Sequence, residues 1–136
     1  MKRLFLILLT MFLLSSMLTA CGREDTLSDK IRDLEFTVVA TENIPNELMI
    51  HMENEKAEVF HKTYSDGDFM YLCVGYGEQE SGGYSITVDE LYLTSEGVYM
   101  DTTLIGPAPG EELTRSKSYP YIVVCTEYMD YPVIFQ

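Results

Sequence analysis

The side chains best placed for chemistry lie in one glycine-rich stretch, from Gly77 to Tyr84. Ser81 is its candidate nucleophile, but a serine hydrolase elbow needs glycine two residues before and after the serine, and Gln79 occupies the first position. The spacing from Gly77 to Gly82 is that of a phosphate loop, yet the lysine and hydroxyl residues that would complete it are missing. The stretch therefore predicts a binding loop without catalysis.

Metal sites are not indicated elsewhere in the chain. His51 and His61 have no histidine or cysteine neighbour at the spacing of a zinc site. The segment Asp66–Asp68 lacks the distal ligands of a calcium loop and predicts a tight hairpin turn, because Asp-Gly tolerates positive φ angles. We expect no metal, no cofactor and no enzymatic activity.

The composition restricts the class of partner. The chain has 136 residues with 22 acidic and 9 basic side chains, a net charge of −13. Such a charge repels nucleic acid and anionic lipid, and it attracts a basic protein or cations. We therefore expect no nucleic-acid partner.

The first residues have the pattern of an export signal. A basic pair, Lys2-Arg3, precedes an apolar run from residue 4 to residue 17 that is too short for a stable membrane span. The run ends in Leu18-Thr19-Ala20-Cys21, which resembles the bacterial lipobox, in which the cysteine thiol accepts a diacylglyceryl group. The alternative is an ordinary secretory signal in which the cysteine is accidental.

The lipobox predicts the organisation of the whole chain. Residues 1–20 are the expected signal peptide, and Cys21 becomes the lipid-modified first residue at the extracytoplasmic face of the cell membrane. Its two acyl chains would anchor the protein firmly. Loss of two basic residues would change the net charge from −13 to −15. Polar residues 21–33 predict a flexible tether, and residues 34–136 predict a single domain.

The hydrophobic pattern of that domain is mostly of period two. It predicts strands at about 36–40, 59–64, 69–76, 84–93, 98–105, 119–125 and 131–135. Ile44, Leu48 and Met52 recur at helical spacing, so one helix is expected to end near Lys56, capped by Asn43 or Asn46. We expect a mainly β fold, an antiparallel β-sandwich or curled sheet of about six or seven strands with one short helix.

Two local features refine this prediction. The apolar face changes phase at Asp89-Glu90, which predicts a β-bulge. Cys73 and Cys125 fall in two apolar strands, where they could be buried thiols or, outside the membrane, a disulfide. The sequence leaves both cysteine states open.

Three landmarks occur in a fixed order along the chain. They are Ser81-Gly82-Gly83-Tyr84-Ser85-Ile86, then Pro107-Ala108-Pro109-Gly110, then Tyr119-Pro120-Tyr121-Ile122-Val123-Val124. Together they resemble the PrcB C-terminal domain family over residues 68–127. That family is named for a protease complex subunit, so the resemblance implies an accessory role at a surface protease. Ser81 stands where the family usually has threonine, and Glu78 and Glu80 are less typical.

These observations predict a non-enzymatic, lipid-anchored extracytoplasmic domain that binds another protein, and the resemblance implies an accessory role in a surface or secreted protease complex. The expected contact surface is formed by two loops, with Tyr84 as anchor and acidic residues that would select a basic partner. Its residues are Gly77, Glu78, Glu80, Ser81, Gly82, Gly83, Tyr84, Pro107 and Pro109.

Two alternatives remain open. One is an extracytoplasmic lipoprotein that binds a small ligand, which a deep pocket would favour. The other is a protease inhibitor, because Gly83-Tyr84-Ser85 is similar to the end of the loop that chagasin-type inhibitors insert into a protease. Ile86 stands where that loop has tryptophan.

Overall fold

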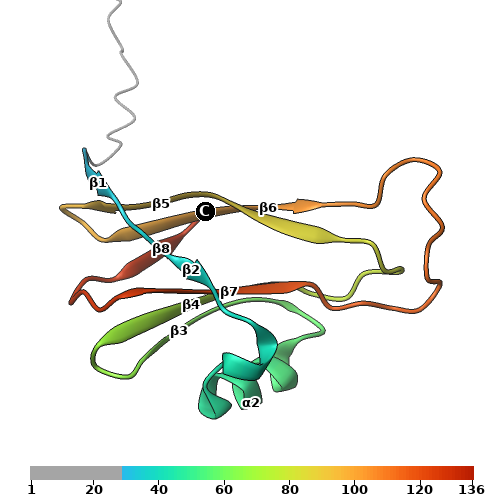
Figure 1. Ribbon diagram of the computed structural model, residues 1–136, viewed down its shortest axis with the longest axis horizontal. Helices are drawn as coiled ribbons and strands as arrows, with labels where there is room; N and C mark the ends of the chain where they lie inside the picture. The colour runs from blue at the N-terminus through green and yellow to red at the C-terminus, as the bar shows by residue number, and fades with distance from the viewer. Residues whose placement is uncertain (1–28) are drawn as a thin grey trace, which may run out of the picture.

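The computed structural model describes residues 29–136 (Figure 1). The expected signal peptide, the lipid-modified Cys21 and the tether up to residue 28 lie outside the described residues. Within residues 29–136, no helix has both the length and the apolar character needed to cross a membrane.

Eight strands form two sheets of four strands each. The strands are β1 (Lys30–Asp33), β2 (Thr37–Val38), β3 (Val59–Ser65), β4 (Phe69–Tyr76), β5 (Ser85–Thr94), β6 (Val98–Ile105), β7 (Tyr121–Glu127) and β8 (Val133–Phe135). The first sheet has the order β1-β5-β6-β8 and the second has the order β2-β7-β4-β3. They face each other as a sandwich, and helix α2 (Asn46–Glu55) lies outside the second sheet (Figure 1). The predicted mainly β fold with one helix is confirmed.

The two sheets bury an apolar layer between them. It consists of Leu34, Met70, Leu72, Val74, Leu91, Leu93, Val98, Met100, Ile122 and Val124. The period of two that predicted the strands places these side chains on the inner faces. Removing each from water contributes about 1.5–3 kcal/mol, so this layer holds the sheets together.

A second apolar layer joins the helix to the second sheet. Leu48 and Met52 lie on one face of α2 and pack with Phe60, Cys73 and Val123. The helical spacing is thus confirmed, but the predicted asparagine cap is wrong. Pro45 occupies the N-cap position, with no side-chain hydrogen bond to the first turn. A short 3-10 helix, η1 (Thr41–Asn43), leads into this turn.

The predicted hairpin and bulge are both present. β3 and β4 pair in antiparallel fashion across a turn in which Gly67 has a φ of 101° and Asp66 Oδ1 accepts the Phe69 amide at 2.8 Å. The register of β5 against β6 shifts between Val88 and Glu90. This shift lets β5 keep an apolar inner face on both sides of the bulge.

Two strands differ from the prediction. The segment Lys30–Asp33, expected at the end of the flexible tether, forms β1 and pairs with β5. Its side chains are all exposed, so it has no apolar period that sequence analysis could detect. β8 is an edge strand, as expected, but it pairs in parallel with β6, which makes the first sheet mixed.

The two cysteines within the described residues are free thiols, which rules out the disulfide considered above. Cys73 pairs with Val123 and Cys125 pairs with Tyr71, so the cysteines are diagonal neighbours on β4 and β7. Diagonal residues are about 7–8 Å apart, which is beyond the usual Cα separation of a disulfide. Burial raises the pKa of the Cys73 thiol to about 12.

Candidate protein-binding tip

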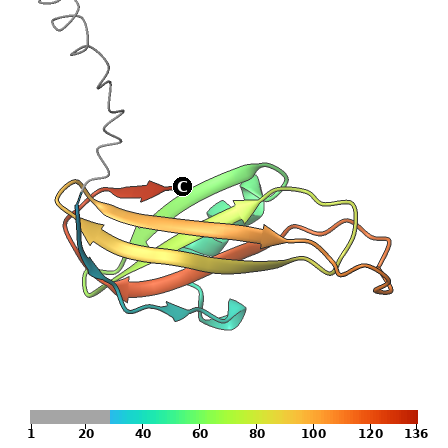
Figure 2. The same cartoon turned by 90° about the horizontal axis from the view of Figure 1, so that it is seen from above.

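Two long loops meet at one end of the sandwich (Figure 1). The loop between β4 and β5 carries residues 77–84, and the loop between β6 and β7 carries residues 106–119. We call these two segments together the tip. β1 begins at the opposite end of the sandwich, so the tip is far from the point where the described chain starts (Figures 1 and 2).

Backbone hydrogen bonds join the two loops. The amide of Gln79 donates to the Ser118 carbonyl at 2.8 Å, and the Ser118 amide donates back at 3.0 Å. The Ser118 hydroxyl donates to the Ser81 carbonyl at 2.6 Å, and the Gly82 amide donates to the Thr114 carbonyl at 3.1 Å. These bonds fix the loops to each other, so the tip is one surface and not two independent loops.

Glu78 fastens the base of the tip. Its carboxylate accepts a hydrogen bond from Lys117 at 2.5 Å and one from the Tyr119 hydroxyl at 3.0 Å. Lys117, and then Tyr119, lower the pKa of Glu78 below its ordinary value of 4.5, while Glu78 raises the pKa of Lys117. Glu78 is a predicted partner-selecting residue, and these contacts give it a positioning role in the tip. The exposed Glu80 carboxylate is the more available of the two.

The glycines of the tip permit close packing between the loops. Gly83 has a φ of +87°, and a Cβ there would lie 3.0 Å from the Pro107 side chain. A Cβ on Gly106 would lie 3.7 Å from the ring of Tyr84, which is half-buried. Tyr84 therefore supports the loops as well as offering part of its ring at the surface. Gly77 is buried, whereas Pro109 is exposed.

Between the loops the tip is hollowed. A depression of about 540 Å³ is lined by Glu80, Ser81, Glu111, Glu112, Leu113 and Arg115. Leu113 is 45% exposed, and its position beside carboxylates creates a mixed apolar and acidic surface. Residues 111–115 are not among the predicted contact residues, because a polar loop of this kind has neither a periodic pattern nor a motif.

Ser81, the candidate nucleophile of the predicted loop, is hydrogen-bonded within that loop. The Ser81 hydroxyl donates to the Gly82 carbonyl at 3.1 Å, and its surroundings in the hollow are carboxylates, a leucine and an arginine. Among residues 29–136, no three His, Cys, Asp or Glu side chains gather in a group that could hold a metal ion.

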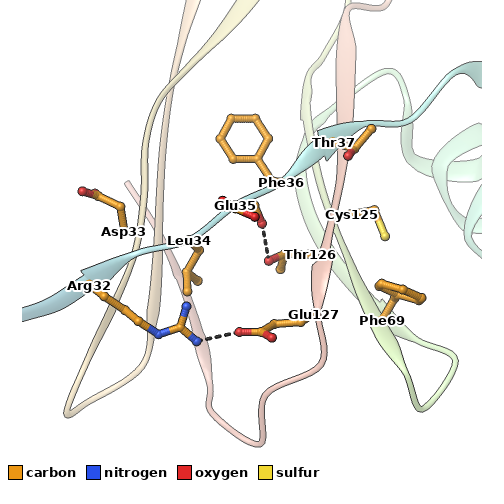
Figure 3. A pocket seen from close by; sticks show the side chains of 10 residues that line it. All are labelled: Arg32, Asp33, Leu34, Glu35, Phe36, Thr37, Phe69, Cys125, Thr126 and Glu127. Atoms are coloured by element: carbon orange, nitrogen blue, oxygen red, sulfur yellow. Dashed lines mark hydrogen bonds and ion pairs between the residues drawn. The ribbon is translucent and has the colours of Figure 1, made fainter.

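A larger groove lies at the other end of the sandwich, where the chain crosses from β1 to β2. Figure 3 shows this groove, which has a volume of about 910 Å³ and includes Phe36, Phe69 and Cys125 in its lining. Three of its polar groups already bond to partners within the chain. Arg32 pairs with Glu127 at 2.6 Å, and the Thr126 hydroxyl donates to a backbone carbonyl at 2.8 Å.

Comparison with known proteins gives one match. A family model described as PrcB C-terminal matches residues 70–127, the region that runs from β4 to the end of β7 and contains both loops of the tip. No curated protein and no solved structure matches the chain.

Proposed function

We propose that this chain is a non-enzymatic domain that binds another protein through the tip, and the match of residues 70–127 to the PrcB C-terminal family model supports this proposal. The domain would be held at the extracytoplasmic face of the membrane by a lipid on Cys21. Its partner would be a surface or secreted protein, with an accessory role in a protease complex as the specific form that the family name suggests.

The construction of the tip is the observation that carries this proposal. Reciprocal backbone bonds between Gln79 and Ser118 hold two loops as one surface at the end of the sandwich opposite β1. An anchor preceding β1 would leave that surface pointing away from the membrane. Loops held by a rigid scaffold are where binding residues concentrate.

The side chains of the tip indicate the chemistry of the partner. Glu78 is engaged by Lys117, whereas Glu80 and Glu112 are exposed beside the apolar surface of Leu113. Three carboxylates and one basic residue, Arg115, line the hollow around Leu113. This excess of negative charge beside an apolar side chain fits a partner with basic residues around an apolar side chain, because complementary charge raises the association rate and selects the partner.

The small-ligand alternative has less support. The groove of about 910 Å³ is large enough for a ligand, but Arg32 and Glu127 neutralise each other there. Ligand sites usually present a few convergent polar groups that orient the bound molecule.

The inhibitor alternative is also weakened. An inserting loop must project freely, whereas Gly82 is bonded to Thr114 of the neighbouring loop. A peptidase assay with the purified chain tests this alternative directly.

The decisive experiment is crosslinking capture from native membranes. The variant Glu80→Ala/Leu113→Ala removes one exposed carboxylate and one exposed aliphatic side chain from the tip. Its matched control, Glu42→Ala/Ile50→Ala, removes one exposed carboxylate and one exposed aliphatic side chain from η1 and α2, outside the tip.

We expect the wild-type chain and the control to capture the same envelope protein, and the tip variant to lose it. Equal capture by all three chains would contradict the assignment of the tip. Capture of nothing specific by any chain would contradict protein binding.

A further inference from the structure

The four edge strands of the sandwich are not protected equally. Sheet edges expose unpaired backbone groups, and proteins usually protect them with short strands, charges or bulges. β2 has 2 residues and β8 has 3, while β1 has 4 residues, three of them charged, and a register irregularity. β3 has 7 residues in continuous register with β4 and contains no proline. It is the longest of the four edges, and the charge of its Lys62 is already paired with Glu55.

The hydrogen-bond pattern shows which residues of β3 face outward. The Asp66 amide donates to the Phe69 carbonyl at 3.2 Å, so the bonded pairs continue at every second residue along the antiparallel ladder. The amide and carbonyl groups of His61 and Thr63 therefore point away from β4. β3 pairs with β4 alone among the described strands, so these groups lie at an open edge.

The side chains on the inner side of this edge include no Asp, Glu, Lys or Arg. Val59 is 65% exposed, and Thr63 is also exposed. The ring of His61 stacks on that of Phe135, with centroids 4.6 Å apart and an angle of 4° between the planes. An extended segment beside β3 would meet the apolar surface of Val59 and the His61–Phe135 stack on this side.

The side facing α2 is acidic. Lys62 is the basic residue of β3, and it pairs with Glu55 at 2.7 Å. Glu47 lies beside Tyr64, whose phenol pKa is raised first by that negative charge. Among residues 29–136 no basic group lies at salt-bridge distance from the carboxylate of Glu47, so the side of the edge near the start of α2 carries unbalanced negative charge.

We propose that the open edge of β3 binds an extended segment of a partner protein in which basic and apolar residues alternate. Main-chain bonds to His61 and Thr63 would add the segment to the second sheet as a fifth strand. Alternate side chains of an extended segment point to opposite faces. Its basic residues would face Glu47, and its apolar residues would face Val59 and the His61–Phe135 stack. This surface is separate from the tip and stands without it.

The test uses the full-length chain in detergent and a synthetic peptide of alternating lysine and valine, as long as the 7-residue β3. Thr63→Pro removes an outward amide without removing a bond to β4. Thr63→Val keeps that amide and is the matched control. A peptide with glutamate in place of lysine tests the charge requirement.

We expect the lysine peptide to bind wild type and Thr63→Val equally, to bind Thr63→Pro at least tenfold more weakly, and to slow hydrogen exchange at His61 and Thr63. The glutamate peptide should bind at least tenfold more weakly than the lysine peptide. If Thr63→Pro does not fold, an N-methylated lysine peptide replaces it and should fail to bind wild type.

Three results would overturn the proposal. The first is absence of lysine-peptide binding, and the second is exchange protection at β1 or the tip in place of β3. The third is a dimer of the peptide-free chain that Thr63→Pro dissociates, because the edge would then belong to a second copy.

Discussion

The hydroxyl of Tyr76 on β4 donates to the Thr102 carbonyl on β6 at 2.9 Å and lies 2.7 Å from the Thr102 hydroxyl. This contact occurs where β8 ends, since the Gln136 amide bonds to the Met100 carbonyl. Carbonyls two residues apart on a strand point to the same side, so the carbonyls of Met100 and Thr102 both face the edge of β6 where β8 pairs. The Tyr76 hydroxyl therefore already bonds the next carbonyl that a longer β8 or an added strand would use. The open part of β6 is thus closed by a side chain of the opposite sheet.

Replacing Tyr76 with phenylalanine should lower the free energy of unfolding by about 1–2 kcal/mol, because a part-buried carbonyl loses its donor. Urea denaturation measures this change. Tyr128→Phe is the control, since Tyr128 is largely exposed and should change stability by less than about 0.5 kcal/mol. Equal effects of the two substitutions would contradict the role assigned to the Tyr76 hydroxyl.

The Glu78 contacts should make the tip sensitive to acid. Lys117 and Tyr119 lower the pKa of Glu78 in the folded protein. The stability that the Glu78 carboxylate contributes to the tip is therefore complete above its ordinary pKa of 4.5 and is lost as the pH falls through the lowered pKa of the folded state. The protection factors of the Gly82 and Ser118 amides, which compare the measured with the intrinsic exchange rate at each pH, should therefore fall in acid.

In Glu78→Gln the protection factors of these two amides should already be lower at neutral pH and should change little as the pH falls. Glu42→Gln, which alters an exposed carboxylate on the helix side, should keep the wild-type pH profile. A wild-type profile in Glu78→Gln would show that another group controls the tip.

Alanine substitutions at two glycines of the tip allow the cost of backbone strain to be measured separately from the cost of close packing. Gly83 and Gly110 have φ values of +87° and +84°, so alanine at either position incurs a backbone penalty of about 1–2 kcal/mol. A Cβ on Gly83 also lies 3.0 Å from Pro107, whereas a Cβ on Gly110 meets nothing within 4 Å. Gly83→Ala should therefore destabilise more in thermal unfolding than Gly110→Ala, and should weaken capture of the partner. The reverse order would contradict the packing of the two loops.

The two described cysteines should differ in reactivity. Cys73 is fully buried with a pKa raised to about 12, whereas Cys125 is partly exposed and its pKa is raised mainly by desolvation. Maleimide should label Cys125 in the native protein and Cys73 only after denaturation, as peptide mapping by mass spectrometry would show. A disulfide-linked peptide from the native protein would contradict the free thiols.

The sequence predicted those parts of the fold that depend on neighbouring residues. The turn at Gly67 follows from the backbone freedom of an Asp-Gly pair, and the bulge between Val88 and Glu90 follows from a change of phase in one strand. Both signals are local, so each could be read without knowing the partner strand.

The tip could be predicted only in part. Its glycine and proline loops were recognisable from composition, but the link from Glu78 to Lys117 joins residues 39 positions apart. Such a contact is created by the sheets that bring the loops together and leaves no periodic pattern. For the same reason, the exposed Leu113 was not distinguishable from an ordinary loop residue.

The layout of the first sheet also has a mechanical consequence. β1 pairs with one end of β5, and the other end of β5 leads from the tip. A pull applied between Asp29 and the tip would run along β5 and β6, whose ladder bonds lie across the direction of force. The bonds would be loaded in shear and would have to break together, so the domain should withstand tension better than one whose strands are peeled apart singly.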